Sequence, residues 1–252
     1  MRGKALRKAA WADLTRPTPS VGVFDPDDLG GLPDPARRFL NHALTPGVEL
    51  VPTVYLEMKG EIKLKTWTPF RARQVLRAGE GFVWEATAGK APIRFRGGDT
   101  FWNGFGSLDF RIWGTIPVAR ESGPDVDRSA AGRLAAETVF WAPQALTTQM
   151  GASWAPIDST TAKVALPVRE DTVNATLTVD YEGRLQEVVT QRWGDPDPDK
   201  HGFHPFGAAV EGYGRFGGIT IVTAGRVGWW WGTERQEEGE FFRFTLTEAR
   251  IG

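Results

Sequence analysis

The strongest constraint on the fold of this chain is a period of two in hydrophobicity, repeated in short stretches and interrupted by glycine, proline and aspartate. The first such stretch begins at Thr53. Its apolar members alternate with polar neighbours and are Val54, Leu56, Met58, Ile62 and Leu64. This alternation is typical of β-strands with one face in a core. Lys59 and Gly60, in the middle of the stretch, predict a tight turn between two strands.

Similar stretches recur along both halves of the chain and predict a large antiparallel sheet. We expect further strands at residues 70–78, 81–88, 92–96, 100–104, 107–113, 162–168, 173–180, 184–193, 210–216, 219–227 and 241–248. Each is bounded by turn-forming residues, as at Gly97, Gly98 and Asp99. Short strands at this regular spacing form a meander, and a meander this long must curl or be covered.

Two helices interrupt the strands. Asp34 and Pro35 suit the start of a helix that ends before Pro46, and residues 129–140 form a strongly helical stretch in the middle of the chain. The predicted fold is therefore mainly β with a few α-helices: a large curved antiparallel sheet, or half-barrel, with helices packed on its concave side. We expect residues 1–31 to be an extended N-terminal lead-in and residues 32–252 to be a single curved-sheet domain. Two subdomains meeting near residues 120–150 are the alternative.

The composition excludes several classes of function. The 252 residues carry a net charge of −1, which gives no electrostatic reason to expect a nucleic-acid partner. The absence of cysteine removes disulfides and thiolate chemistry. No stretch resembles a signal-peptide core or a membrane-spanning segment, so we expect a cytoplasmic protein without stable membrane insertion. No metal or cofactor motif is recognisable, and the oligomeric state stays open.

The unusual feature of the composition is aromatic. The chain has 11 Trp and 15 Phe but only 3 Tyr. Apolar rings at this density predict a wide hydrophobic interior or a lined cavity, because each ring buries a large area and only the indole needs a hydrogen-bond partner.

Several segments resemble an uncharacterised family of bacterial proteins, a domain of unknown function. They are LPDPARRFLNHAL (32–44), MKGEIKLKTWTPFRARQ (58–74), GFVWEA (81–86), DRSAAGRLAAETVFWAPQAL (127–146) and DYEGRLQEVVTQRWG (180–194). They occur in the expected order over most of the chain from residue 32. The resemblance implies a fold similar to the half-barrels of lipoprotein carriers, in which a curved sheet and a helical lid enclose an apolar cavity. It implies no particular activity.

The central helix carries the most informative polar residues. Arg133 and Glu137 lie four residues apart and therefore on one face, with Trp141 one turn further along. A carboxylate and a guanidinium in an apolar helix could act as an acid or base and an anion stabiliser. An ion pair that only orients the helix, or lies in solvent, is the alternative.

Other residues are candidates for lining a cavity. The ligand-binding candidates are Trp84, Trp113, Trp141, Trp193, Arg192 and Asp99. The charged members could recognise a polar head group, although charge pairs on a hydrated sheet face explain them equally well. The role of two further segments stays open. Trp229–Trp231 cannot all be buried on one side of a strand, and the loop from Asp195 to His204 contains oxygen and nitrogen ligands but no recognised metal spacing.

Two functions of different classes follow. The first is the binding of an apolar small molecule or lipid-like metabolite in a cavity lined by Trp and Phe. The second is a cofactor-independent enzyme, such as a cyclase, isomerase or hydrolase, that acts on an apolar metabolite in the same cavity with Glu137 as acid or base and Arg133 as anion stabiliser. A module that contacts other proteins through the tryptophan run is a third. A pocket of roughly 300 Å³ or more would separate the first two from the third.

Overall fold

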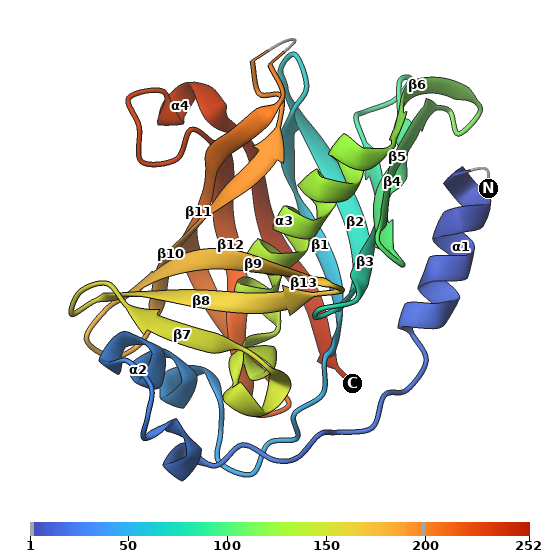
Figure 1. The fold of residues 1–252 in the computed structure, drawn as a ribbon. Coiled ribbons are helices and arrows are strands. Elements are labelled where there is room, and N and C mark those ends of the chain that lie inside the picture. Colours follow the sequence, from blue (N-terminus) through green and yellow to red (C-terminus); the bar gives the residue numbers. More distant parts are fainter. Residues whose placement is uncertain (1–2, 198–199) are drawn as a thin grey trace.

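The computed structural model describes residues 3–197 and 200–252, and within them thirteen strands form one antiparallel sheet (Figure 1). In chain order the strands are β1 (Thr53–Lys63), β2 (Trp67–Arg77), β3 (Gly81–Ala88), β4 (Phe95–Trp102), β5 (Phe105–Ile112), β6 (Ile116–Ser122), β7 (Ser153–Pro156), β8 (Thr161–Val168), β9 (Asp171–Val179), β10 (Leu185–Gly194), β11 (Gly202–Phe216), β12 (Ile219–Trp229) and β13 (Glu240–Ile251). The predicted mainly β fold is confirmed.

Four α-helices and three short 3-10 helices accompany the sheet in the described residues. The α-helices are α1 (Gly3–Leu14), α2 (Asp34–Ala43), α3 (Pro124–Trp141) and α4 (Gln236–Gly239); the 3-10 helices are η1 (Pro26–Leu29), η2 (Pro143–Leu146) and η3 (Thr148–Met150). Helices α2 and α3 correspond to the two that the sequence predicts. Among the described residues, no helix combines the length and the apolar character needed to cross a membrane.

Two meanders meet in the middle of the sheet. The strand order is β6-β5-β4-β3-β2-β1-β13-β12-β11-β10-β9-β8-β7, so the first and last strands of the chain are neighbours. Their antiparallel pairing runs from Val54 opposite Ile251 to Ile62 opposite Phe242. The outer strands β6 and β7 are the edges, and α3 is the connection between them. The helix must therefore cross the sheet from one half to the other.

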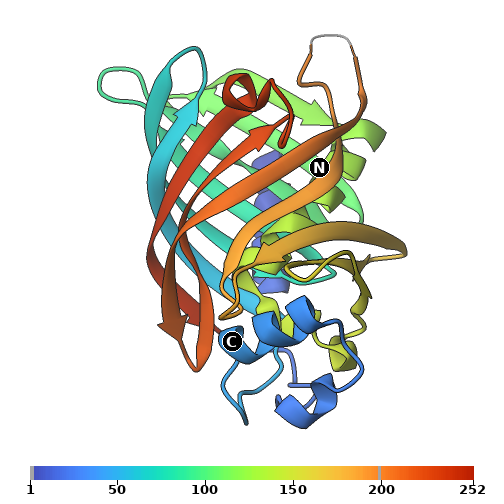
Figure 2. The ribbon, with the colours of Figure 1, turned by 90° about the vertical axis from the view of Figure 1, so that its left-hand side faces the viewer.

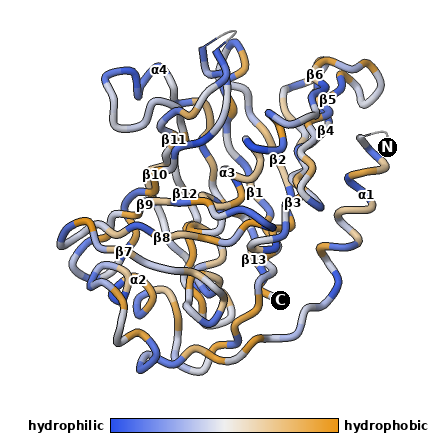
Figure 3. The backbone as a smooth tube through the Cα atoms, viewed as in Figure 1, coloured by the Kyte–Doolittle hydropathy of each residue, from blue (hydrophilic) through white to orange (hydrophobic). Residues whose placement is uncertain are grey.

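Helix α3 crosses on the concave side of the sheet, as the sequence predicts (Figures 1 and 2). Its residues Leu134 and Val139 are buried in the main core together with Leu76 and Phe82 of the strands. Figure 3 shows hydrophobic and hydrophilic stretches alternating along the strands, which is the pattern of a sheet with one covered face. The core therefore fills the concavity around α3.

The N-terminal segment differs from the extended lead-in that we expected. Residues 3–14 form helix α1, which packs on the opposite, outer face of the sheet (Figure 1). Ala10 and Leu14 bury against Val75 and Val83, whose neighbours along the strands face the main core. The physical reason for the difference is tertiary. The outer face of β2 and β3 offers apolar side chains that reward helix formation, and this cannot be recognised from the N-terminal residues alone.

Arg77 fixes the end of this helix. Its Nη2 donates hydrogen bonds to the carbonyl oxygens of Leu14 at 2.9 Å and Arg16 at 2.6 Å, and its side chain is 9% exposed. The last carbonyls of a helix lack intrahelical donors, so a buried guanidinium at this position satisfies them. The segment from residue 15 onward then runs in an extended path beneath the sheet to η1 and α2 (Figure 1).

The tight turn predicted at Lys59 and Gly60 is wrong. Strand β1 continues through both residues to Lys63, and the turn follows there. Gly60 serves a different purpose, because a Cβ atom at this position would lie 1.9 Å from the carbonyl oxygen of Arg243 in the neighbouring strand β13. Glycine is required by the close approach of two strands rather than by a turn.

We expect Gly60→Ala to destabilise the protein by about 1–3 kcal/mol, because β1 and β13 must separate to admit the methyl group. Gly31→Ala is the matched control, since a Cβ atom there would have nothing within 4 Å. Urea unfolding of both variants measures the difference. Equal unfolding midpoints for the two variants would contradict the argument from close packing.

Candidate functional site

A pocket of about 530 Å³ lies between α3 and the concave face of the sheet. Its walls come from both meanders, from β1 and β3 to β6 on one side and from β10 to β13 on the other. Pockets that hold small-molecule ligands have volumes of roughly 300–1,000 Å³. The pocket therefore exceeds the size below which the binding hypothesis would have failed.

Aromatic side chains dominate the pocket wall. They are Trp84, Phe95, Phe110, Phe140, Trp141, Phe206, Trp229, Phe241, Phe242 and Phe244. Several hold one another in place: the rings of Phe206 and Trp229 have centroids 5.0 Å apart, and those of Trp141 and Phe244 are 5.4 Å apart, both nearly perpendicular. Edge-to-face packing of this kind fixes ring orientations. The wall is thus preformed and almost wholly apolar.

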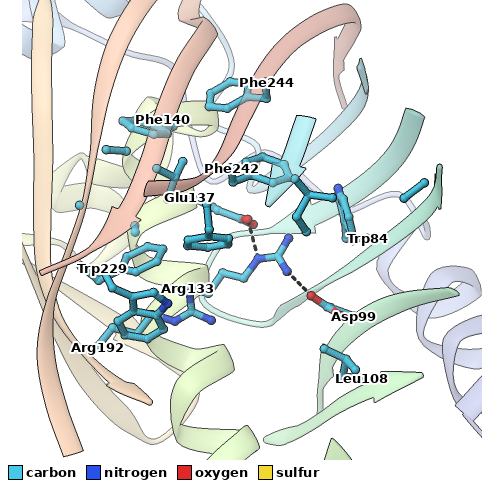
Figure 4. A pocket seen from close by; sticks show the side chains of 18 of the residues that line it. Trp84, Asp99, Leu108, Arg133, Glu137, Phe140, Arg192, Trp229, Phe242 and Phe244 are labelled. Carbon is cyan, nitrogen blue, oxygen red and sulfur yellow. Dashed lines mark hydrogen bonds and ion pairs between the residues drawn. The ribbon is translucent and has the colours of Figure 1, made fainter. Parts of the chain in front are cut away.

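One region of the wall is charged (Figure 4). Arg133 of α3 donates from Nη1 to Asp99 Oδ2 of β4 at 2.7 Å and from Nε to Glu137 Oε1 at 2.6 Å. The second oxygen of Glu137 accepts a hydrogen bond of 2.6 Å from Gln74 Nε2. Burial opposes the charge on Arg133, but the two carboxylates outweigh it and raise the pKa of the guanidinium. Arg133 therefore stays charged and ties the helix to the sheet.

Arg192 of β10 has a different environment. Its Nε donates to the carbonyl oxygen of Ser129 at 3.0 Å, and its Cζ lies 4.5 Å from the ring centroid of Phe206 and 5.1 Å from that of Trp229. Among the described residues, no carboxylate lies within ion-pair distance of it. Burial, and then the positive charge of Arg133, lower the pKa of Arg192 to about 9. This cation on the pocket wall lacks the counter-ion that Arg133 has.

Two polar atoms beside the cluster also lack partners. Trp84 Nε1 and Asp99 Oδ1 are buried and form no hydrogen bond with any described residue. A second hollow of about 200 Å³ adjoins the pocket here and shares four residues with it, Asp99, Leu108, Arg133 and Arg192. Buried donors and acceptors are normally satisfied. The residue Asp99 lines both hollows and Trp84 lines the pocket, but the two unpartnered atoms themselves are enclosed by protein and are not exposed to either space.

The cluster limits the acid–base chemistry that the site can perform. Both oxygens of Glu137 accept short hydrogen bonds from protein donors, so both are already engaged by the protein. Burial raises the pKa of the Asp99 carboxyl, although Arg133 opposes the shift. Asp99, which also lines the pocket, is therefore a second candidate for giving or taking a proton there.

The structure brings together six of the eight residues that the sequence singles out. Those on the pocket wall are Trp84, Asp99, Arg133, Glu137, Trp141 and Arg192. Trp113 and Trp193 are not among them. Trp113 lies in the turn after β5 with 60% of its surface exposed, and Trp193 packs against Phe203 at a separate hollow. The reason for Trp193 is alternation, since it follows Arg192 in a strand and points to the opposite face.

Sequence reasoning missed much of the aromatic wall. Phe242 and Phe244 of β13 both face the pocket, and the period of two in residues 241–248 was the signal that could have found them. Phe140 lies three residues after Glu137 and seven after Arg133, so helical spacing was the signal that could have found it. Phe206 carried no comparable signal, because its position depends on how β11 packs in the folded chain.

The three consecutive tryptophans, Trp229–Trp231, pack in three different environments. Trp229 ends β12 and lines the pocket. Trp230 adopts a left-handed backbone conformation, with φ of 52°, and stacks under Arg235, whose Cζ is 3.6 Å from the ring centroid. Trp231 donates from Nε1 to Glu187. The break in the strand after Trp229 is what allows three consecutive indoles to be packed, and it brings one of them into the pocket.

The loop from Asp195 to His204 shows no arrangement that points to a metal. Asp197 pairs with Arg235 at 2.8 Å, and His201 lies 3.9 Å from Asp195. Asp199 lies outside the described residues. Among the residues that are described, no group of three or more His, Asp or Glu side chains is placed to hold a metal ion.

Comparison with known proteins identifies the family of this chain. A family described as being of unknown function, DUF6544, matches residues 22–244, which include all five segments that carry the resemblance noted above. That resemblance is confirmed. None of the curated proteins matches the sequence.

Three solved structures are similar over most of their length. A DUF1329 family protein from Desulfovibrio piger is 13% identical, with a TM-score of 0.41 over 86% of this chain and 90% of that chain. A proposed outer membrane lipoprotein-sorting protein domain from Vibrio parahaemolyticus is 7% identical, with a TM-score of 0.39 over 79% and 84%. A LolA superfamily protein from Nitrosomonas europaea is 9% identical, with a TM-score of 0.37 over 79% and 85%.

We expect Arg133→Met to cost about 3–5 kcal/mol of stability at neutral pH, because it leaves Asp99 and Glu137 without their counter-ion in a poorly hydrated site. The deficit should shrink as the pH is lowered from neutral, since the pKa of the Asp99 carboxyl is raised by burial and its protonation removes one unpaired charge. Urea unfolding at neutral and at acidic pH measures this.

Arg73→Met is the control for Arg133→Met. Arg73 also pairs with a carboxylate, Glu85 at 2.6 Å, but its side chain is 58% exposed. An exposed pair contributes less than about 1 kcal/mol, so this variant should remain close to wild type. Similar losses in the two variants, or a deficit at Arg133 that does not depend on pH, would contradict a buried ion-pair cluster.

Proposed function

We propose that this chain, which belongs to the DUF6544 family, binds a small molecule that has an apolar body and one polar end. The observation that supports this most is the pocket itself: about 530 Å³, walled by aromatic rings and charged in one region only. Apolar pockets with a few convergent polar groups are the usual form of small-molecule sites. The aromatic wall would hold the apolar body, and the charged region would set its direction.

The polar end of the ligand would lie at Arg192, in the charged region of the pocket wall. Arg192 supplies a cation without a carboxylate partner. This favours an anionic oxygen, such as that of a carboxylate, because it would neutralise the cation. We therefore propose an amphiphile with an acidic head as the ligand class.

A cofactor-independent enzyme acting on the same kind of molecule is the second candidate. The observation that favours it is Asp99, a carboxyl with a raised pKa in a residue of the pocket wall. Perturbed carboxyls in clefts are candidates for acid–base catalysis. In this form of the proposal Asp99 takes the acid–base role first assigned to Glu137. Chemical change of a bound compound over time would distinguish an enzyme from a carrier.

Ala136→Phe should abolish ligand binding without unfolding the protein. Ala136 lies on the pocket face of α3, and a phenyl ring there would occupy the volume that we assign to the ligand. Native mass spectrometry of protein purified gently from its host should show a stoichiometric apolar adduct in the wild type and none in the variant. The neutral fluorescent probe phenylnaphthylamine should bind the wild type at least about tenfold more tightly than it binds Ala136→Phe. In the variant, the probe would lose most of the apolar contact area that it buries in the wild-type pocket.

Ala12→Phe is the control, because Ala12 lies on the exposed face of α1. It should bind the probe as the wild type does. A wild-type protein that carries no adduct and does not bind the probe would refute the proposed function, and so would equal binding by Ala136→Phe.

Arg192→Met should remove the preference for an acidic head. We expect the wild type to bind dodecanoate about tenfold or more tightly than dodecanol, as a charged hydrogen bond is worth about 1.5–3 kcal/mol. The preference should decline as the pH rises past about 9, where Arg192 loses its proton. Isothermal titration with both compounds measures it. Arg71→Met, an exposed position on β2, should keep the preference. A variant at Arg192 that still prefers dodecanoate would show that the head lies elsewhere.

A further inference from the structure

Three neighbouring hairpin tips lie at one end of the sheet, beside the pocket. They are residues 63–66 at the turn between β1 and β2, residues 89–94 between β3 and β4, and residues 113–118, which form the turn after β5 and the start of β6 (Figure 1). The second and third tips are joined, because Trp113 donates from Nε1 to the carbonyl oxygen of Pro92 at 2.8 Å and from its backbone N–H to that of Arg94 at 3.0 Å. We call these three segments the tip surface.

Large apolar side chains are exposed on the tip surface. The exposed fractions are 52% for Leu64, 50% for Ile93, 60% for Trp113, 51% for Ile116 and 47% for Val118. These five make up a large share of the exposed big apolar side chains in the described part of the chain, although the three segments are short. Single exposed apolar residues are ordinary, but a cluster marks a surface that contacts something apolar.

The charge of the tip surface has one sign. Lys63, Lys65, Lys90 and Arg94 lie within the three segments, which contain no Asp or Glu. All four are exposed. The remaining loops at this end are acidic, with Asp195 and Asp197 before β11 and Glu234, Glu237 and Glu238 before β13. The apolar cluster therefore coincides with the basic half of the rim and not with the acidic half.

We propose that the tip surface docks on an anionic lipid bilayer. Its aliphatic and indole side chains would enter the head-group region while the lysines and Arg94 contact lipid phosphates, as in other surfaces that combine exposed apolar residues with basic ones. Charge complementarity selects an anionic membrane over a neutral one. The proposal does not depend on which ligand the pocket holds.

The position of the pocket agrees with this orientation. Leu64 and Val118 belong to the tip surface and also line the pocket wall. Docking would thus place one side of the pocket against the lipid. Helix α1 is also basic, but its large apolar residues are covered by the sheet to a greater extent than those of the tip surface: Leu14 is buried, and Leu6 and Trp11 are half-buried.

Vesicle flotation with the full chain tests the proposal. We expect binding to vesicles of phosphatidylcholine mixed with phosphatidylglycerol, weak or no binding to phosphatidylcholine alone, and loss of binding as salt is raised. Lys65→Gln and Lys90→Gln should each weaken binding roughly fivefold. Equal binding to both kinds of vesicle, or no binding to either at low salt, would overturn the proposal.

A pair of matched double variants locates the surface. Ile93→Glu with Ile116→Glu should reduce vesicle binding at least about tenfold, since both carboxylates would meet anionic lipid. Phe105→Glu with Tyr181→Glu adds the same charge at exposed apolar positions outside the tip surface, where 65% and 84% of the side chains are exposed, and should bind as the wild type does. Equal effects of the two pairs would refute the assignment. So would loss of binding in Lys4→Gln with Lys8→Gln, which would place the contact on α1. Retained phenylnaphthylamine binding in each variant shows that the pocket is intact.

Discussion

One long helix, α3, crosses the apolar concave face of a much wider sheet, with α2 and η2 adding to the same core, and the other features follow from this difference in width. Thirteen strands at about 4.8 Å spacing span roughly 58 Å of arc. A helix with its side chains is only about 10–12 Å wide. Helix α3 therefore cannot fill the concavity, and the remaining space is divided between large aromatic side chains and the pocket. The excess of Phe and Trp over Tyr is a consequence, because rings that fill such a volume must be apolar unless a partner is within reach.

The charged cluster is best understood from the same geometry. A lone helix in a wide concavity needs a fixed position, and Arg133 provides one by joining α3 to Asp99 on β4. Arg133 engages the two nearby carboxylates, Asp99 and Glu137, and Arg192, on the other meander, is left without a counter-ion. Burial of unpaired charge is costly, so an unpaired guanidinium on a pocket wall is either a structural defect or a place for an anion. Its contact with the rings of Phe206 and Trp229 orients the group without neutralising it.

The sequence predicts local periodicity well and long-range contacts poorly. Alternation at Val54, Leu56 and Met58 established the strands, and the spacing of Arg133 and Glu137 correctly placed both on one face of a helix. Gly60 was misread as a turn because its cause is a contact with Arg243, far along the chain. The partnership of Arg133 with Asp99 was likewise hidden, since it depends on where α3 crosses the sheet. Trp193 is different, because it follows Arg192 directly in a strand. Strand alternation alone therefore places the two side chains on opposite faces of the sheet.

The release of an apolar ligand connects the pocket with the tip surface. A ligand with about 300 Å² of apolar surface would lose roughly 7 kcal/mol of transfer free energy on leaving such a pocket for water. Release into water would then be slow even if the pocket opened freely. Release into a bilayer avoids most of this barrier, provided that the apolar wall continues to the lipid without a polar gap. Leu64 and Val118 line the pocket and are also exposed on the tip surface, so apolar side chains belong to both. A protein that only stored its ligand would have no need of exposed aliphatic residues at that position, whereas one that exchanges an apolar ligand with a membrane would.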